Sequence, residues 1–325
     1  MANAMQLVST WQSEYFADVF MVPAIGEGSS FDSSIYDVDP TVNKSRTDYN
    51  ATELKYATRK QAGCGFTANG SISLSERVLE VEPFKVMLEQ CFDTFYSTAF
   101  RGKLKRGSAI NDLSGTFVQQ IFEQQIPITI GKDLMKHGWF GDTSISTTGA
   151  NAFLSDIDGW FKLLEADGDV NKYSLSTTAG DLTSDSVLTT LREMYSANLV
   201  LRGKASQTKI LATTAVYDNL VNTYENLGTD SGLARLAAGG ALTFRGIEVI
   251  SMEVWDEAIT DFSLSNPHRL VWTVNENLRV GTDITNPRNE GKLFMDELTE
   301  LTYFKARFDF GVQYRFSNSI AYARG

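Results

Sequence analysis

Histidine and cysteine are scarce in this sequence of 325 residues, which contains two of each. His137 and His268 do not stand in an HExxH or HxxxH spacing, and no Cys/His cluster exists, so the ligand set of a zinc site is missing. Cys64 and Cys91 lack a secretory context, and we expect two free, packed thiols in a reducing cytosol. We therefore expect no metal and no cofactor.

Positive charge is also in short supply. The chain has 29 Lys and Arg against 40 Asp and Glu, which gives a net charge of −11. This balance argues against a protein that coats nucleic acid with its whole surface, although one basic patch remains compatible with it. The first residues have no basic start and no unbroken apolar run, so we expect neither a signal peptide nor a membrane partner.

Sequence signatures of catalysis are missing as well. No GxxxxGK[ST] or GxSxG motif occurs, and no pair of carboxylates stands out among the many. The stretch from Asp167 resembles the start of a calcium loop, but Lys172 and Thr178 replace the glycine and glutamate that such a loop needs. We interpret it as an acidic turn after a helix, and we predict no catalytic residues.

Apolar residues, in contrast, are plentiful at 42%, and their spacing predicts an α/β unit between about residues 140 and 284. Helices are expected at 150–164, 187–199 and 215–228. Strands are expected at 208–214, 242–252, 268–274 and 278–281.

Two segments before this unit have helical periodicity. Residues 83–100 read as an amphipathic helix, although Phe84, Val86 and Leu88 also alternate as in a strand. Residues 114–137 predict a second helix that Pro127 interrupts or kinks. Lys136-His137-Gly138 is typical of a helix end, where a basic side chain compensates the helix dipole. His268 is expected in a turn before a strand.

The segment 304–316 alternates strictly between apolar even positions and mostly polar odd positions. This pattern predicts a long strand with one buried face, with a turn or bulge at Gly311.

A thin hairpin is predicted around Asn69-Gly70, the residue pair that best tolerates a type I′ turn. Its apolar side is narrow because only Ile72 and Leu74 alternate with the serines that follow the turn. Such a hairpin buries little surface within its own chain, so we expect it to lie on another surface.

One dense basic run, RGKLKR, stands out in the acidic chain through Arg101, Lys103, Lys105 and Arg106. It fits either a solvated helix end or a docking patch for an acidic surface. The chain offers such a surface in MDELTEL of another copy, with Asp296, Glu297 and Glu300.

Several stretches resemble the major capsid proteins of tailed bacteriophages, which have the HK97 fold, as these occur in phages of Bacteroidota-type hosts, including crAss-like ones. The stretches are CGFTANGSISLSERVLEVEPFKVMLEQC, IGKDLMKHGWFGD, IDGWFKLLEAD, LTFRGIEVISMEVWDE and VWTVNENLRVGTDI. The order of segments also resembles that family: an arm, a thin hairpin, a long helix, an α/β unit and a final β segment.

The resemblance implies an α+β HK97-like fold in four parts. Residues 1–45 would be the N-terminal arm, and 46–82 the extended loop that lies across a neighbouring subunit. Residues 83–140 and 285–325 would form the peripheral domain with its spine helix and sheet, and 141–284 the axial domain.

The resemblance also implies a non-enzymatic protein of the virion, assembled in the host cytoplasm into pentamers and hexamers of an icosahedral head around double-stranded DNA. Its partners would be other copies of itself within and between capsomers, the portal, and scaffolding or decoration proteins. The packaged DNA would lie against the inner surface without specific contacts. The alternatives are an encapsulin-like shell, another phage structural protein such as a tail component, and a hydrolase built on the α/β unit.

Overall fold

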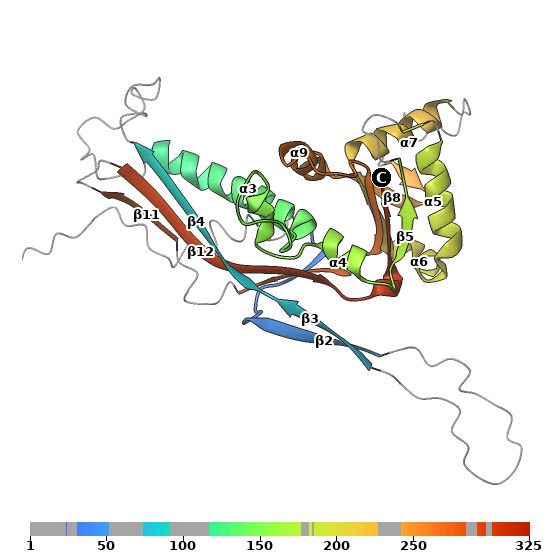
Figure 1. The fold of residues 1–325 in the computed structure, drawn as a ribbon, viewed down its shortest axis with the longest axis horizontal. Helices are drawn as coiled ribbons and strands as arrows, with labels where there is room; N and C mark the ends of the chain where they lie inside the picture. Colours follow the sequence, from blue (N-terminus) through green and yellow to red (C-terminus); the bar gives the residue numbers. More distant parts are fainter. Residues whose placement is uncertain are drawn as a thin grey trace, which may run out of the picture.

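A computed structural model describes residues 24, 31–51, 74–91, 117–176, 182–183, 185–226, 242–283, 291–296 and 301–325. A long sheet covered by one helix lies beside a second sheet flanked by several helices, and a two-stranded ribbon runs out beneath the long sheet (Figure 1). The α+β, HK97-like architecture expected from the resemblance is confirmed.

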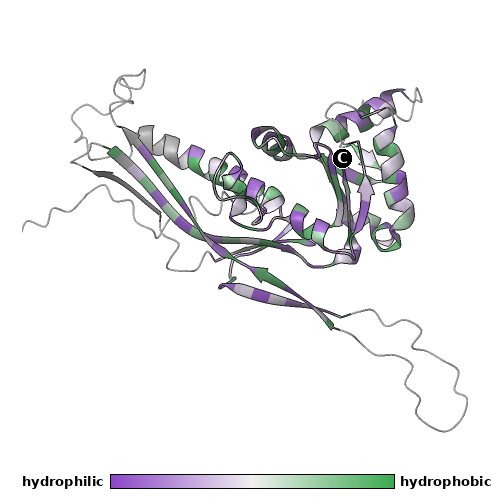
Figure 2. Cartoon of the chain, viewed as in Figure 1, coloured by the Kyte–Doolittle hydropathy of each residue, from purple (hydrophilic) through white to green (hydrophobic). Residues whose placement is uncertain are grey.

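The long sheet is built around β12 (Leu301–Tyr314), which pairs with β4 (Glu82–Cys91), β10 (Leu278–Thr282) and β11 (Gly291–Asp296). β1 (Tyr36–Asp39) adds to β10 in parallel. The predicted alternation in β12 is confirmed: the even-numbered side chains from Phe304 to Tyr314 are buried, whereas Phe316 lies beyond the strand and is exposed. Hydrophilic and hydrophobic residues alternate along these strands in Figure 2.

Helix α3 (Phe117–Phe140) lies along the buried face of this sheet (Figure 1). The helix continues through Pro127, so of the predicted interruption or kink the interruption is wrong. Ile126 and Ile130 flank the proline and are buried in the core, and this packing outweighs the missing backbone hydrogen bond. The helix also continues past Gly138. Because this residue has no side chain, the helix backbone can approach Trp160 and Val312 closely.

The helix predicted for residues 83–100 is wrong in its first half, since β4 is a strand as far as Cys91; the rest lies outside the described residues. The alternation of Phe84 and Val86, which pack on the core, decides the structure because β12 supplies a complete antiparallel ladder beside them. The single helix predicted at 150–164 is a short 3₁₀ turn, η4 (Ala152–Ser155), followed by α4 (Trp160–Ala166).

The second sheet has the order β5 (Asn171–Ser174), β13 (Ile320–Arg324), β9 (Arg269–Val274), β6 (Thr208–Ala212), β8 (Ile247–Ser251) and β7 (Thr243–Phe244). Its helices are α5 (Ser186–Ala197), α6 (Leu199–Gly203), α7 (Thr214–Asn226) and α9 (Glu253–Asp261). Short 3₁₀ turns η5 (Ala205–Gln207) and η6 (Ser317–Ser319) precede β6 and β13.

Strand pairing differs from the predicted domain boundaries at two segments. Residues 278–282, assigned to the axial domain, form β10 of the long sheet, and residues 320–324, assigned to the peripheral domain, form β13 of the second sheet. The chain therefore crosses between the sheets three times, after β4, after β9 and after β12. Buried Asn277 joins the last two crossings: its side-chain nitrogen donates to the carbonyl of Phe316 (3.1 Å), and its side-chain oxygen accepts from the Phe316 amide (2.8 Å).

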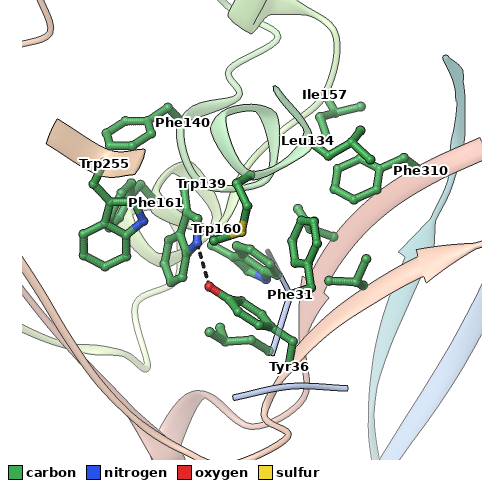
Figure 3. Packing of buried hydrophobic residues seen from close by; sticks show 14 of the residues in the cluster. Phe31, Tyr36, Leu134, Trp139, Phe140, Ile157, Trp160, Phe161, Trp255 and Phe310 are labelled. Atoms are coloured by element: carbon green, nitrogen blue, oxygen red, sulfur yellow. Dashed lines mark hydrogen bonds between the residues drawn. The ribbon is translucent and has the colours of Figure 1, made fainter. Parts of the chain in front are cut away.

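One aromatic core continues from the long sheet into the α/β unit. The ring of Trp139 lies 4.7 Å from Trp160 and 4.6 Å from Trp255 between centroids, and its indole nitrogen donates to the hydroxyl of Tyr36 at 3.1 Å (Figure 3). Tyr36 belongs to the predicted N-terminal arm. Phe31, Ile35 and Tyr36 of that arm are thus part of the subunit's own core, and Phe31 is fully buried.

His137 lies in the last turn of α3, as predicted, but its predicted charge is wrong. It is buried between Phe84 and Phe153, whose ring centroids lie 5.1 and 4.1 Å away. Burial lowers the pKa of His137 from its ordinary value of 6.5 to about 4. The side chain is therefore neutral near pH 7 and packs as part of the core instead of compensating the helix dipole.

This burial predicts an acid-sensitive fold. Between pH 6.5 and 4 the unfolded chain binds a proton at His137 that the folded chain does not, so stability falls as pH falls through this range, by at most ~3 kcal/mol from this residue. We expect His137→Leu to have a smaller loss of unfolding free energy between pH 7 and 4.5 in urea titrations. Equal losses in the two proteins would contradict the assignment.

Candidate functional site

The candidate functional site is a surface, the two-stranded ribbon beneath the long sheet. Among the described residues, no group of three His, Cys, Asp or Glu side chains is placed to hold a metal ion, and no helix is long and apolar enough to cross a membrane. A hollow of about 730 Å³ lies at the base of the ribbon, lined by Lys44, Glu80, Glu82 and Asp309 among others. It contains no histidine or cysteine.

The ribbon consists of β2 (Ser45–Ala51) and β3 (Leu74–Glu80), paired antiparallel. It occupies the segment predicted as a hairpin, but its register differs from the prediction. Leu74 lies opposite Ala51, whereas a two-residue turn at Asn69-Gly70 would place it opposite residue 65. The ladder therefore does not start from that turn, and residues 69 and 70 themselves lie outside the described part of the chain.

The two faces of the ribbon differ in character. On the inner face, Asp48 and Arg77 form ion pairs with the body of the subunit, and the amide nitrogen of Asn50 donates to the Arg315 carbonyl at 2.7 Å. On the outer face, Tyr49 and Leu74 are 66% and 67% exposed, and Val78 is 41% exposed. The ribbon thus contacts its own subunit through these polar groups and buried Leu79, and presents three apolar side chains on its outer face. Figure 1 shows the ribbon beneath the long sheet.

Buried Arg279 on β10 holds the base of the ribbon. Its guanidinium is 2% exposed, and it lies 3.1 Å from the carboxylates of Asp37 and Asp39 and also pairs with Asp48. Arg315 pairs with Asp37 at 2.6 Å, and Arg46 pairs with Asp39. Three arginines and three aspartates thereby join β1, β2, β10 and the end of β12.

The carboxylate of Asp39 is ionised in this network. Burial alone would raise its pKa, but hydrogen bonds from Thr41 and the charges of Arg46 and Arg279 outweigh that effect and hold the pKa below its usual value. The buried guanidinium therefore faces an ionised carboxylate in Asp39, which is the condition for a buried ion pair to be tolerated.

A second ionic contact holds β3 farther along the ribbon. Asp167, at the end of α4, pairs with Arg77 and accepts a hydrogen bond from the hydroxyl of Tyr314 at 2.6 Å. The guanidinium of Arg77 also lies 4.2 Å from the centre of the Tyr314 ring. The acidic turn predicted after a helix at Asp167 thus serves as an anchor for the ribbon.

A pair of glycines lets β3 cross the sheet. Gly281 and Gly311 lie opposite each other on β10 and β12. A Cβ atom on Gly311 would lie 1.8 Å from the Glu80 carbonyl oxygen, and one on Gly281 would lie 2.9 Å from Val81. Leu79 and Val81 are buried with Val42 in a small separate core at this crossing.

The bulge predicted at Gly311 is wrong, because the pairing of β10 with β12 continues through Gly311 without a shift in register.

Of the residues predicted to make contacts between subunits, Leu74 lies on the outer face of the ribbon. Asp296 ends β11 opposite Leu301. The others lie outside the described residues and remain predictions: Asn69, Gly70, Ile72, Arg101, Lys103, Lys105, Arg106, Glu297 and Glu300.

Sequence reasoning missed Tyr49, Val78 and the whole Arg279 network. The available signal was an arginine inside the apolar segment LRVG, which required buried counter-charges somewhere in the fold.

The fold is shared with solved phage structures. A chain of the satellite phage P4 procapsid, whose structure includes the size determination protein Sid, is similar with a TM-score of 0.59 at 10% identity, covering 91% of this chain and 87% of that one. A chain of the capsid of Myoviridae phage XM1 is similar with a TM-score of 0.55 at 12% identity, and the match covers 90% of both chains. A chain of the cyanophage P-SCSP1u capsid is similar with a TM-score of 0.55 at 12% identity, and the match covers 89% of this chain and 86% of that one. No protein-family model and no curated protein matches the sequence.

Loss of Arg279 should destabilise the subunit. Arg279→Met leaves three carboxylates without their shared cation, and we expect a loss of ~3–5 kcal/mol in urea unfolding, since breaking a buried ion pair leaves uncompensated charge. Arg46→Met is the matched control: its side chain is 52% exposed, so we expect a loss of at most ~1 kcal/mol. Similar effects from the two substitutions would contradict the central position of Arg279.

The glycine crossing gives a second test. Gly311→Ala puts a methyl group onto the Glu80 carbonyl, and we expect a loss of ~2 kcal/mol or more in thermal unfolding together with faster hydrogen exchange in β3. Gly168→Ala meets nothing within 4 Å and should leave both measurements unchanged. Unchanged exchange in the Gly311 variant would show that β3 does not cross there.

Proposed function

We propose that this chain is a major capsid protein of a tailed bacteriophage, which assembles as pentamers and hexamers into an icosahedral shell around double-stranded DNA. The fold shared with phage capsid chains over about nine tenths of their length supports this proposal. The observation that carries it is the ribbon, whose apolar side chains face away from the subunit that anchors it.

In this proposal, segment 46–82 lies across a neighbouring subunit. Burying one large apolar side chain stabilises a contact by ~1.5–3 kcal/mol, so Tyr49, Leu74 and Val78 supply only a modest energy per subunit. A closed shell repeats the same contact in every copy, and the total then becomes large. The protein works as a structural component of the virion and catalyses no reaction.

The remaining parts take the roles that the capsid fold assigns. Helix α3 is the spine of the peripheral domain, and the unit around β6, β8 and β9 gathers around capsomer centres as the axial domain. Assembly takes place in the host cytoplasm, with the portal and with scaffolding or decoration proteins as further partners. The packaged DNA lies against the inner surface without sequence-specific contacts.

Electron microscopy of the expressed chain tests the proposal. We expect closed shells or capsid-like tubes, and DNA-filled heads with a portal vertex when the particles come from infected cells. Shells that enclose a co-purifying enzyme would instead indicate an encapsulin-like container. A monodisperse subunit at every protein and salt concentration would contradict a capsid role.

The outer face of the ribbon provides the sharper prediction. We expect Leu74→Glu to keep the thermal stability of the free subunit, because Leu74 is exposed there, and to prevent shell formation, because a charge then enters an apolar contact. Ser75→Glu adds the same charge one residue away on the opposite face of the ribbon and should still assemble. Assembly of the Leu74 variant at normal yield would show that this face stays in water.

A further inference from the structure

The two-residue turn between β7 and β8 carries an unusual residue. Arg245 and Gly246 both have positive φ angles, 51° and 82°, as a type I′ turn requires. Asn or Gly normally occupies the first position, because an arginine there places its Cβ close to the backbone. Residues held in such strained conformations cluster at functional sites, so the side chain of Arg245 is a candidate for a role in binding.

The side chain of Arg245 lies on a prepared support. Its guanidinium is 4.4 Å from the centre of the Tyr195 ring on α5, and that of Arg202 on α6 is 6.0 Å away. Tyr195 is itself fixed, since Trp272 packs nearly parallel to it with ring centroids 5.8 Å apart. The β7–β8 turn and α6 thus each place one guanidinium at the same ring on α5.

Within the described part of the chain, neither guanidinium has an ion-pair partner. Arg202 and Arg245 are both exposed, and no carboxylate of the described residues lies within ion-pair distance of either. The other arginines that hold the fold together, such as Arg279 and Arg77, are paired with aspartates. In a chain with a net charge of −11, two arginines at one ring, without a carboxylate partner among the described residues, form a distinct positive site.

We propose that Arg245 and Arg202 bind carboxylates of a second copy of this chain. The inference rests on the proposed function, because it deepens self-assembly with a second contact, far from the ribbon. The planar guanidinium pairs with a carboxylate through two parallel hydrogen bonds, and each copy of this acidic chain offers carboxylates in excess. The aromatic support keeps the guanidinium oriented before contact, which lowers the entropy lost on binding.

A nucleic acid fits the site less well. Single-stranded nucleic acid binds where an aromatic face is free to stack on a base, and here Trp272 and Arg245 already cover the Tyr195 ring. The overall negative charge of the chain also repels a phosphate backbone.

The test compares Arg245→Asn with wild type. Asn suits the left-handed turn, so we expect an equal or higher melting temperature for the free subunit. Loss of the charged pair should nevertheless raise the protein concentration needed for shell formation about tenfold and weaken its dependence on salt. Arg202→Glu should act in the same direction. Lys204→Glu, a neighbouring exposed change without contact to the ring, is the matched control.

A photo-cross-linking amino acid at position 245 identifies the partner. In assembled shells we expect a covalent link to a segment of a second copy that contains Asp or Glu. A link to nucleic acid, or assembly of Arg245→Asn at the wild-type concentration, would overturn the inference while leaving the proposed function intact. If the wild-type chain forms no shells at all, the proposed function itself fails.

Discussion

The buried guanidinium of Arg279 is the constraint on which the arrangement of the subunit depends. It brings together Asp37, Asp39 and Asp48, which lie about 240 positions earlier in the chain, and so fixes β1 and β2 against β10. A charge at 2% exposure is stable only when all its partners are present. The arm strand, the base of the ribbon and the long sheet must therefore form together.

The ribbon reverses the usual distribution of polarity. In a protein that works alone, apolar side chains face the body and charges face water. Here Asp48 and Arg77 face the body, while Tyr49 and Leu74 face outward. The polar anchors and buried Leu79 hold the ribbon without using Tyr49, Leu74 or Val78, and these three side chains stay exposed. Because the inner-face and outer-face side chains have separate roles, a thin ribbon can have both an anchored base and an exposed apolar face.

Local periodicity predicted the elements whose own sequence pattern determines their structure, such as the alternating strand β12 and the helix α5. The predictions failed where contacts with a segment far away in the sequence determine the structure. β4 has both helical and alternating patterns, and only the ladder from β12 makes the strand the stable choice. The counter-charges of Arg279 depend on contacts across more than 200 residues, which no local pattern records. The ribbon register depends on the pairing of β2 with β3, which the Asn69-Gly70 signal did not predict. The apolar character of Leu74 was visible in the sequence, but its outward direction was not.

Two places in the subunit differ in stiffness for a physical reason: the joint that connects the two sheets, and the base of the ribbon. The joint consists of Trp139, Trp160 and Trp255 in ring contact and of the hydrogen bonds of Asn277, and such packing loses its energy within fractions of an ångström. The ribbon base is held by arginine side chains, whose ion pairs weaken only gradually as distance grows. A displacement of the joint would therefore disrupt the core that both sheets share. At the ribbon base the ion pairs would tolerate a small displacement, and the close contact of Gly311 with Glu80 would be the one that limits it.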